Sequence, residues 1–278
     1  MPDEAFASFE DKWLAANPEQ AVVAVFLAPE QRLRAAAFGA LVHELQQAAF
    51  GASDPQVSSV KLNWWAQELV SAGNGGRRHP ITTALFKHEA ARAIEPALWA
   101  ELVSGAFAQV ESAPVSTQSD TVATLAKFYQ PVARLDAALV ASAESPTPKA
   151  AALWIGSHRL RDLANPARVR VVPLDLLARH QLSRAQLAEP GRQRSGLLRE
   201  LLQEVRGDIA DALIAAPLAS PGTRVRALLD LDRIAGALRT EDPAIAIAEA
   251  RPSRWRSLWF AWREARRAAG RPAARPGT

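Results

Sequence analysis

Residues 151–183 read AALWIGSHRLRDLANPARVRVVPLDLLARHQLS and contain the most informative pattern of the chain. The segment predicts a helix that ends before Pro166, an arginine-rich connection, and a short helix after Pro173, because proline is favoured in the first turn of a helix. Four residues of the first helix are spaced at i, i+4, i+7 and i+11: Ala151, Ile155, His158 and Asp162. They share one face, so a histidine and a carboxylate lie on a stripe that would otherwise be apolar.

The composition predicts an all-α protein. Apolar residues make up 49% of the 278 residues, and alanine and leucine, which dominate them, favour helix over strand. The chain has no cysteine, which excludes disulfides and thiolate metal sites and suits a reducing compartment. The longest apolar run, residues 21–28, is far shorter than the ~20 residues that span a bilayer, and the acidic start does not resemble a secretory signal. We therefore expect a cytoplasmic protein that is soluble or peripheral to the inner face of a membrane.

Short connections rich in Gly, Pro, Ser and Asp divide the chain into helical segments. No strand-like alternation or internal repeat is present, so we expect one domain over residues 1–269, with a disordered tail over 270–278. Besides the two helices in the quoted stretch, the predicted helices cover residues 3–17, 19–28, 29–49, 56–72, 79–92, 95–111, 117–143, 194–213, 223–238 and 253–269.

A second polar stripe is expected on the helix over residues 29–49. Its members are spaced like those of the first stripe: Ala36, Ala40, His43 and Gln47, with Glu44 directly after His43. Small residues beside polar ones are what a cavity wall needs. The alternative is a tight helix–helix contact whose polar ends lie in solvent. The presence of the first stripe favours the cavity wall.

These stretches together resemble the signatures of the squalene/phytoene synthase family. The family's Leu-Arg-Asp and its later strap match Leu160-Arg161-Asp162 and residues 168–173, and the chain has similar segments at residues 61–69, 79–80 and 128–133. The resemblance covers roughly residues 30–240 and implies an isoprenoid synthase-type helical bundle around a central cavity. It also implies that Tyr129 faces the cavity and that three arginines bind substrate: Arg161, Arg168 and Arg170.

The chain departs from the family pattern at its acidic residues. In the family, two acidic clusters hold Mg²⁺ ions that bridge a prenyl diphosphate. Mg²⁺ requires oxygen ligands, and it neutralises the negative charge that develops as diphosphate leaves. Here only Glu44 remains of the first cluster and only Asp162 of the second. Four non-acidic residues stand at the other acidic positions: His43, Gln47, Asn165 and Pro166. In addition, His158 replaces the family's asparagine.

A different metal site is an alternative, because two histidines and two carboxylates suit Zn²⁺ or iron. Its ligands would be His43, Glu44, His158 and Asp162. Glu44, however, lies about 100° around its helix from His43, so the four side chains are not expected to converge. We therefore predict no metal site and no cofactor, with Mg²⁺ bound only if the protein is an enzyme.

Two functions follow from the resemblance. The first is a catalytically degenerate family member that binds a lipid-like isoprenoid ligand or acts as an assembly or partner-binding protein. The alternative is a divergent prenyltransferase that condenses farnesyl or geranylgeranyl diphosphate head to head. The loss of carboxylates favours the first.

The C-terminal segment accounts for the basic charge of the chain. The net charge is +4 and the pI about 9.9, and from Arg251 onward there are eight arginines and one acid. Residues 253–269 predict a helix with an apolar stripe: Trp255, Leu258, Trp259 and Trp262. Tryptophan and arginine both favour the head-group region, so an anionic membrane is one candidate partner. The alternative is a last helix that packs its tryptophans on its own domain. No nucleic-acid-binding motif accompanies the charge, and we expect no nucleic acid partner.

Overall fold

The computed structural model describes residues 2–51, 54–111, 115–141, 149–164 and 172–269, and these residues form helices and turns only. The prediction of an all-α fold is confirmed. The helices of the first half are α1 (Pro2–Ala16), α2 (Pro18–Ala24), α3 (Pro29–Gln46), α4 (Pro55–Gly73), α5 (Pro80–Leu85), α6 (Glu89–Arg92), α7 (Pro96–Val110) and α8 (Gln118–Asp136). Those of the second half are α9 (Ala150–Leu163), α10 (Leu174–Arg179), α11 (Arg192–Ala215), α12 (Pro221–Ala237), α13 (Pro243–Glu249) and α14 (Arg254–Ala269).

Proline and side-chain caps set most helix starts. The first turns of α2, α3, α4, α5, α7, α12 and α13 all contain proline, whose fixed φ suits this position and whose missing N–H is not needed there. Side chains that accept a hydrogen bond from the first-turn backbone cap five helices: Asp54, His79, Thr117, Ser220 and Asp242. Except at α13, the same residue types are why the sequence predicted helices at these places.

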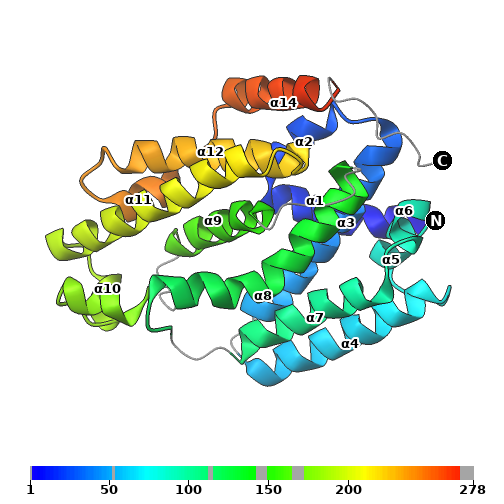
Figure 1. Cartoon of the computed structure of the whole chain (residues 1–278), viewed down its shortest axis with the longest axis horizontal. Helices are drawn as coiled ribbons and strands as arrows, with labels where there is room; N and C mark the ends of the chain where they lie inside the picture. The colour runs from blue at the N-terminus through cyan, green and yellow to red at the C-terminus, as the bar shows by residue number, and fades with distance from the viewer. Residues whose placement is uncertain (1, 52–53, 112–114, 142–148, 165–171, 270–278) are drawn as a thin grey trace.

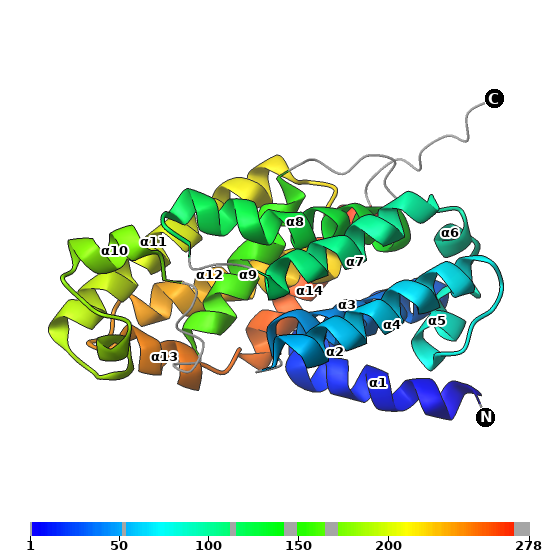
Figure 2. The same cartoon turned by 90° about the horizontal axis from the view of Figure 1, so that it is seen from below.

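Helix α9 lies at the centre of the bundle. It packs against α8, α11 and α12, and Figures 1 and 2 show it enclosed among these helices. All its residues are buried except Ala152 and Arg161, which are half-buried. The pair α4 and α7 forms an outer layer against α3 and α8. The stretch quoted from the sequence therefore supplies the innermost helix of the fold.

The boundaries differ from the predicted ones in three places. The segment predicted as one helix over residues 79–92 is two, α5 and α6, with His88 in the turn before α6. Helix α13 was not predicted, although Asp242-Pro243 is a capping residue followed by a first-turn proline. Helices α3 and α8 each continue into a π-helical turn, Gln47–Gly51 and Ala137–Ala141. The predicted tail, residues 270–278, lies outside the described residues.

Two glycines give opposite predictions for stability. A Cβ at Gly105 in α7 would lie 2.2 Å from the backbone oxygen of Lys127 in α8, whereas a Cβ at Gly207 in α11 meets nothing within 4 Å. We expect Gly105→Ala to lower the free energy of unfolding by about 1–3 kcal/mol or more, because backbone cannot move away cheaply. Gly207→Ala is expected to raise it by about 0.4–1 kcal/mol, because alanine loses less entropy in a helix. Urea titrations check both, and effects of the same sign would contradict the packing described here.

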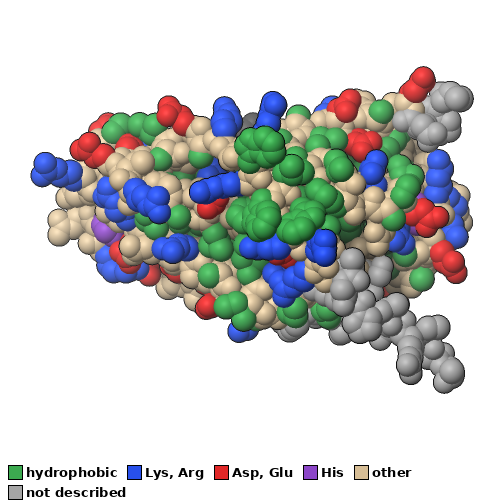
Figure 3. All heavy atoms as spheres, turned by 90° about the horizontal axis from the view of Figure 1, so that it is seen from above, with side chains coloured by type: hydrophobic (Ala, Val, Ile, Leu, Met, Phe, Trp, Pro, Cys, Tyr) green, Lys and Arg blue, Asp and Glu red, His purple; other side chains and the backbone are tan. Residues whose placement is uncertain are grey.

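Helix α14 lies on the outside of the bundle, against α12 and α2. Its own residues Ser257, Ala261 and Glu264 face the bundle and are buried, whereas its tryptophan stripe faces outward. Figure 3 shows hydrophobic side chains gathered on this face with arginines and lysines around them. The alternative that the tryptophans pack on the domain is therefore wrong. None of the helices in the described ranges is both long and apolar enough to cross a bilayer.

Candidate functional site

Three predicted site residues meet in the interior between α8 and α9. His158 Nε2 lies 3.0 Å from Asp162 Oδ2, one turn along α9, and His158 Nδ1 lies 2.8 Å from the hydroxyl of Tyr129 on α8. All three side chains are at least nine-tenths buried. The fourth member, Gln46 at the end of α3, donates from Nε2 to the Tyr129 hydroxyl at 3.1 Å. The row Gln46–Tyr129–His158–Asp162 therefore joins three helices through polar contacts.

The hydrogen bonds of this row fix the histidine tautomer. The Asp162 carboxylate can only accept, so the proton of the neutral His158 ring lies on Nε2 and is donated to Asp162. Nδ1 then accepts from the Tyr129 hydroxyl, whose oxygen accepts from Gln46. Each member of the row thus donates to the next, and the carboxylate is the final acceptor. All the hydrogen bonds of the row therefore run in one direction, from Gln46 to Asp162.

Tyr129 provides a direct test of this environment, because it is the only tyrosine of the chain. Burial, the largest effect, raises the pKa of its phenol above the usual value of about 10, and the nearby Asp162 acts in the same direction. We expect no phenolate absorbance at 295 nm in the folded protein near pH 10. Since the folded state holds this proton more tightly than the unfolded state, its contribution to stability is complete below pH ~10 and is lost as the pH rises above it. Native phenolate formation near pH 10 would contradict the burial.

Aromatic rings surround the polar row. The Phe50 ring lies 4.3 Å from His158, and the Trp154 ring stacks on Tyr129 at 6.5 Å with an interplanar angle of 17°. The guanidinium of Arg226, from α12, lies over Trp154 at 5.2 Å. Trp154 Nε1 is buried and has no hydrogen-bond partner among the described residues. These rings occupy the centre of the bundle, where the resemblance implies a cavity.

The other predicted residues lie around this centre. His43 is half-buried; burial, the largest effect, and the Arg161 charge lower its pKa, while Glu44 raises it. Glu44 is half-buried and Gln47 is exposed, so Gln46 rather than Gln47 reaches Tyr129. Arg168 and Arg170 lie outside the described residues.

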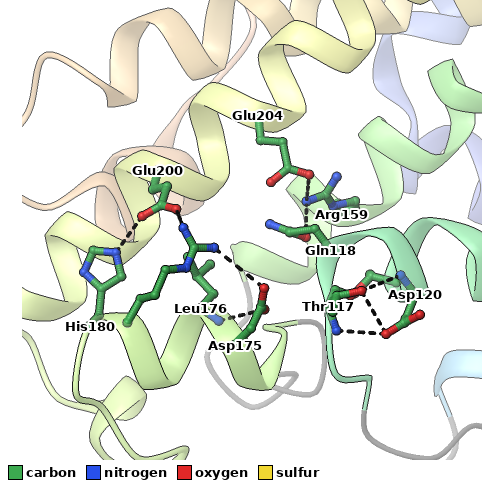
Figure 4. Close-up of polar contacts among 11 residues, drawn as sticks. Thr117, Gln118, Asp120, Arg159, Asp175, Leu176, His180, Glu200 and Glu204 are labelled. Carbon is green, nitrogen blue, oxygen red and sulfur yellow. Dashed lines mark hydrogen bonds and ion pairs between the residues drawn. The ribbon is translucent and has the colours of Figure 1, made fainter.

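A second polar cluster, around Arg159 of α9, joins neighbouring helices. Arg159 is buried and contacts the side chains of Gln118 on α8 at 2.7 Å and Glu204 on α11 at 3.5 Å (Figure 4). Nearby, His180 Nε2 lies 2.8 Å from Glu200 Oε2, which attaches the segment after α10 to α11. Because Arg159 faces the acids Glu204 and Asp208, this cluster explains the packing of α9 on α11.

Two hollow spaces adjoin the centre. The first, of about 60 Å³, lies among α1, α2, α3, α9 and α12, and His43 and Gln46 contribute to its wall. It can hold a few water molecules, whereas ligand sites of ~300–1,000 Å³ are typical for lipid-sized molecules. The second is a cleft of about 670 Å³ between the start of α2, α9, α12 and the segment before α14. Arg226 lines both spaces.

The larger cleft is rich in arginine. Five line it: Arg161, Arg226, Arg233, Arg251 and Arg256. Arg226 Nε pairs with Glu19 at 2.9 Å, Arg256 with Asp232 at 2.5 Å, and Arg233 donates to the Ile247 carbonyl at 2.7 Å. Alanines and Leu229 line the cleft as well, together with three acids, Glu19, Asp230 and Asp232. The lining is therefore partly apolar, and its arginines outnumber its acids.

Arg161 differs in its contacts from Arg226, Arg233 and Arg256, which all have a hydrogen-bond or ion-pair partner. No hydrogen bond or ion pair joins it to any residue in the described part of the chain. Burial, the largest effect, and the neighbouring Arg226 charge both lower its pKa, so its positive charge is held at a cost. Asp230 and Glu19 act in the opposite direction, but Asp230 accepts a 2.5 Å hydrogen bond from Ser157 and Glu19 pairs with Arg226 at 2.9 Å. A half-buried cation without a direct partner in the described chain is an arrangement that an anion would stabilise.

Comparison with known proteins identifies the family. The model of squalene/phytoene synthases matches residues 16–240, which is most of the chain. The chain belongs to the squalene/phytoene synthase family. The resemblance predicted from short motifs is thus confirmed, and no curated protein matches the sequence.

Solved structures agree with the fold of this squalene/phytoene synthase family member. A crystal structure of a dehydrosqualene synthase in complex with ligand superposes with a TM-score of 0.72 at 13% identity, over 95% of this chain and 96% of that one. A squalene synthase HpnC from Alicyclobacillus acidocaldarius gives a TM-score of 0.53 at 16% identity, over 96% and 93% of the two chains. At these identities the likeness concerns the fold alone.

The described donor set does not fit the Mg²⁺ ions that the family resemblance implies. Within the described ranges, no group of three or more histidines and carboxylates is close enough to hold a metal ion. Asp162 contacts His158, and the position three residues after Glu44 is the exposed Gln47. The positive charge near this family member's centre comes from arginines instead.

Arg226, Gln46 and Trp154 were not predicted as site residues. Gln46 and Trp154 lie beside the predicted stripes, within one residue of Gln47 and Ile155. Arg226 is far away in the sequence, and its signal was a charged residue inside the otherwise apolar stretch 225–229. A cation in an apolar helical stretch predicts a buried partner, which here is Glu19.

Proposed function

We propose that this squalene/phytoene synthase family member binds an amphipathic, isoprenoid-like ligand with an anionic head group and does not condense prenyl diphosphates. The observation that carries the proposal is Arg161, which has no hydrogen-bond or ion-pair partner among the described residues and lines a cleft of about 670 Å³ with four other arginines. Phosphate and carboxylate groups match the planar guanidinium and accept its charged hydrogen bonds. The alanines and Leu229 that also line the cleft suit the apolar part of such a ligand.

The proposal that the protein does not turn over prenyl diphosphates rests on the loss of carboxylates from the family's two acidic clusters. Departure of diphosphate from an allylic carbon needs charge neutralisation in the transition state, and paired acidic clusters with Mg²⁺ supply it in the family as the resemblance implies. Here the described candidates are Glu44 and Asp162, and Asp162 is the acceptor of the His158 ring proton. Ligand binding therefore needs the arginines, whereas metal-assisted chemistry would need ligands that this chain lacks at those positions.

Head-to-head condensation of prenyl diphosphates is the second candidate function. One observation favours it: the positive charge of the cleft arginines can also stabilise a leaving diphosphate. The two functions differ in a single measurable product. Condensation releases pyrophosphate and forms a C30 or C40 hydrocarbon, and binding releases neither.

The test combines calorimetry with a pyrophosphate assay on the full-length protein. We expect farnesyl diphosphate to bind with or without Mg²⁺, farnesol to bind at least tenfold more weakly, and no pyrophosphate to appear. Inorganic pyrophosphate separates recognition of the head group from recognition of the chain. Turnover that requires Mg²⁺ would replace this proposal with the enzymatic one. Failure of all three compounds to bind would remove the ligand proposal.

A further inference from the structure

The outward face of α14 is an unusual surface for a protein in water. Trp255 is 81% exposed and Trp259 56%, and Leu258 and Trp262 extend the same stripe at about 40% each. Large apolar side chains grouped on one exposed face mark an interaction site, because scattered single residues would need no explanation. The Trp259 and Trp262 rings lie 5.1 Å apart, so they form one continuous apolar surface.

The packing of α14 makes this orientation stable. The inward face of α14 carries two small side chains, Ala261 and Ser257, which allow close approach to α12. It also carries Glu264, whose carboxylate pairs with the buried Arg224 at 2.7 Å. If the helix turned its tryptophans inward, Glu264 would enter solvent and leave the Arg224 charge buried and unpaired. The tryptophans therefore remain outside even though water is a poor environment for them.

Arginines accompany the exposed stripe. Five exposed ones belong to α14: Arg254, Arg256, Arg263, Arg266 and Arg267. Arg256, Arg263 and Arg267 are spaced at i, i+7 and i+11 and follow one side of the stripe. The Arg266 guanidinium lies over the Trp262 ring at 5.4 Å, at the end of the stripe. The apolar surface therefore lies within a positively charged border, as Figure 3 shows.

We propose that α14 docks the protein on an anionic phospholipid surface, with the tryptophans in the head-group region and the arginines on lipid phosphates. Charge complementarity selects this occupant: a neutral apolar groove on a partner protein would match the tryptophans but not five exposed arginines. Tryptophan and arginine both favour the membrane interface, and a helix of this pattern lies in its plane. The proposal concerns an outer surface and is independent of the cleft ligand.

The experiment is co-sedimentation of the full-length protein with phosphatidylcholine vesicles that do or do not contain about 30 mol% phosphatidylglycerol. We expect binding to the anionic vesicles only. Raising the salt from about 0.1 M to about 1 M shortens the screening length from about 10 Å to about 3 Å and should weaken that binding strongly. Trp255→Ala/Trp259→Ala is expected to reduce the partition coefficient at least tenfold. Arg263→Gln/Arg267→Gln is expected to reduce it roughly 25-fold, at about fivefold for each arginine.

The matched control replaces two exposed apolar residues on other helices, Val60→Ala/Ile214→Ala, which are 70% and 80% exposed. This variant should bind vesicles as the wild type does. Because all the substituted side chains are at the surface, circular dichroism should be unchanged in every variant, and Tm should fall by no more than about 2 °C for each arginine that loses its contact with Glu264. Equal binding by the tryptophan variant and the wild type, or no binding to anionic vesicles, overturns the proposal. So does a dimer that only the tryptophan variant converts to monomer, since a second copy would then cover this face.

Discussion

Replacing Glu264 by alanine is expected to lower Tm by about 6–10 °C. The Glu264 carboxylate lies 2.7 Å from Nε of Arg224, and both side chains are almost fully buried. Removing one partner of a buried ion pair leaves an uncompensated charge and costs about 3–5 kcal/mol, or about 2 °C per kcal/mol for a chain of this size. Differential scanning calorimetry measures the change.

Arg267→Gln is the matched control for this prediction. Arg267 contacts the same carboxylate at 3.7 Å but from the solvent side, where its own side chain is 43% exposed. An exposed ion pair contributes at most about 1 kcal/mol, so Tm should fall by no more than about 2 °C. If Glu264→Ala and Arg267→Gln have the same effect, Glu264 does not act through the buried pair.

Replacing Arg161 by glutamine is expected to raise the dissociation constant of farnesyl diphosphate about 10- to 100-fold. A charged hydrogen bond in a partly buried site contributes about 1.5–3 kcal/mol, and Arg161, unlike Arg226, Arg233 and Arg256, has no hydrogen-bond or ion-pair partner in the described chain. Tm should be unchanged or higher, because burial and the Arg226 charge both disfavour the charged form of Arg161 in the folded protein. This combination of weaker binding with equal or greater stability distinguishes a ligand-binding residue from a structural one.

The control for Arg161 is Arg179→Gln. Arg179 is 54% exposed and pairs with Glu200 beside α10, away from the residues that line the cleft. This variant should bind farnesyl diphosphate as the wild type does. A loss of Tm in Arg161→Gln without a loss of affinity would show that Arg161 supports the fold instead.

The sequence predicted the helices well because its signals are local. Proline, capping side chains and apolar periodicity lie within the helices they define, and α9 was predicted with its histidine and carboxylate on one face. Gln46 was missed for a different reason. The stripe was extended from Ala36 by regular α-helical spacing to Gln47, but the contacts with the polar row come from Gln46 and, in the π-helical turn, Phe50. Backbone geometry of this kind leaves no clear mark in a single sequence.

Long-range pairing accounts for the other misses. An apolar stripe in the last helix indicates either a core face or a membrane face, and the sequence of α14 alone fits both. The orientation depends on Arg224, 40 residues away, because this buried cation holds Glu264 inward. The cleft likewise combines Arg161 and Arg226 from two helices, with the acids Glu19 and Asp230 that accompany them. Such partners become visible only when the helices are assembled.

Arg256 belongs to two surfaces at once, since it lies on α14 and also lines the cleft. Pro252 and Ser253, directly before the helix, line the cleft as well. A protein resting on a bilayer through α14 would therefore hold the rim of its cleft at the level of the lipid phosphates. An amphiphile could then enter sideways from the leaflet, and occupancy would depend on its mole fraction in the membrane and not on its solubility in water. Exchange would be a two-dimensional search whose rate is set by lateral diffusion.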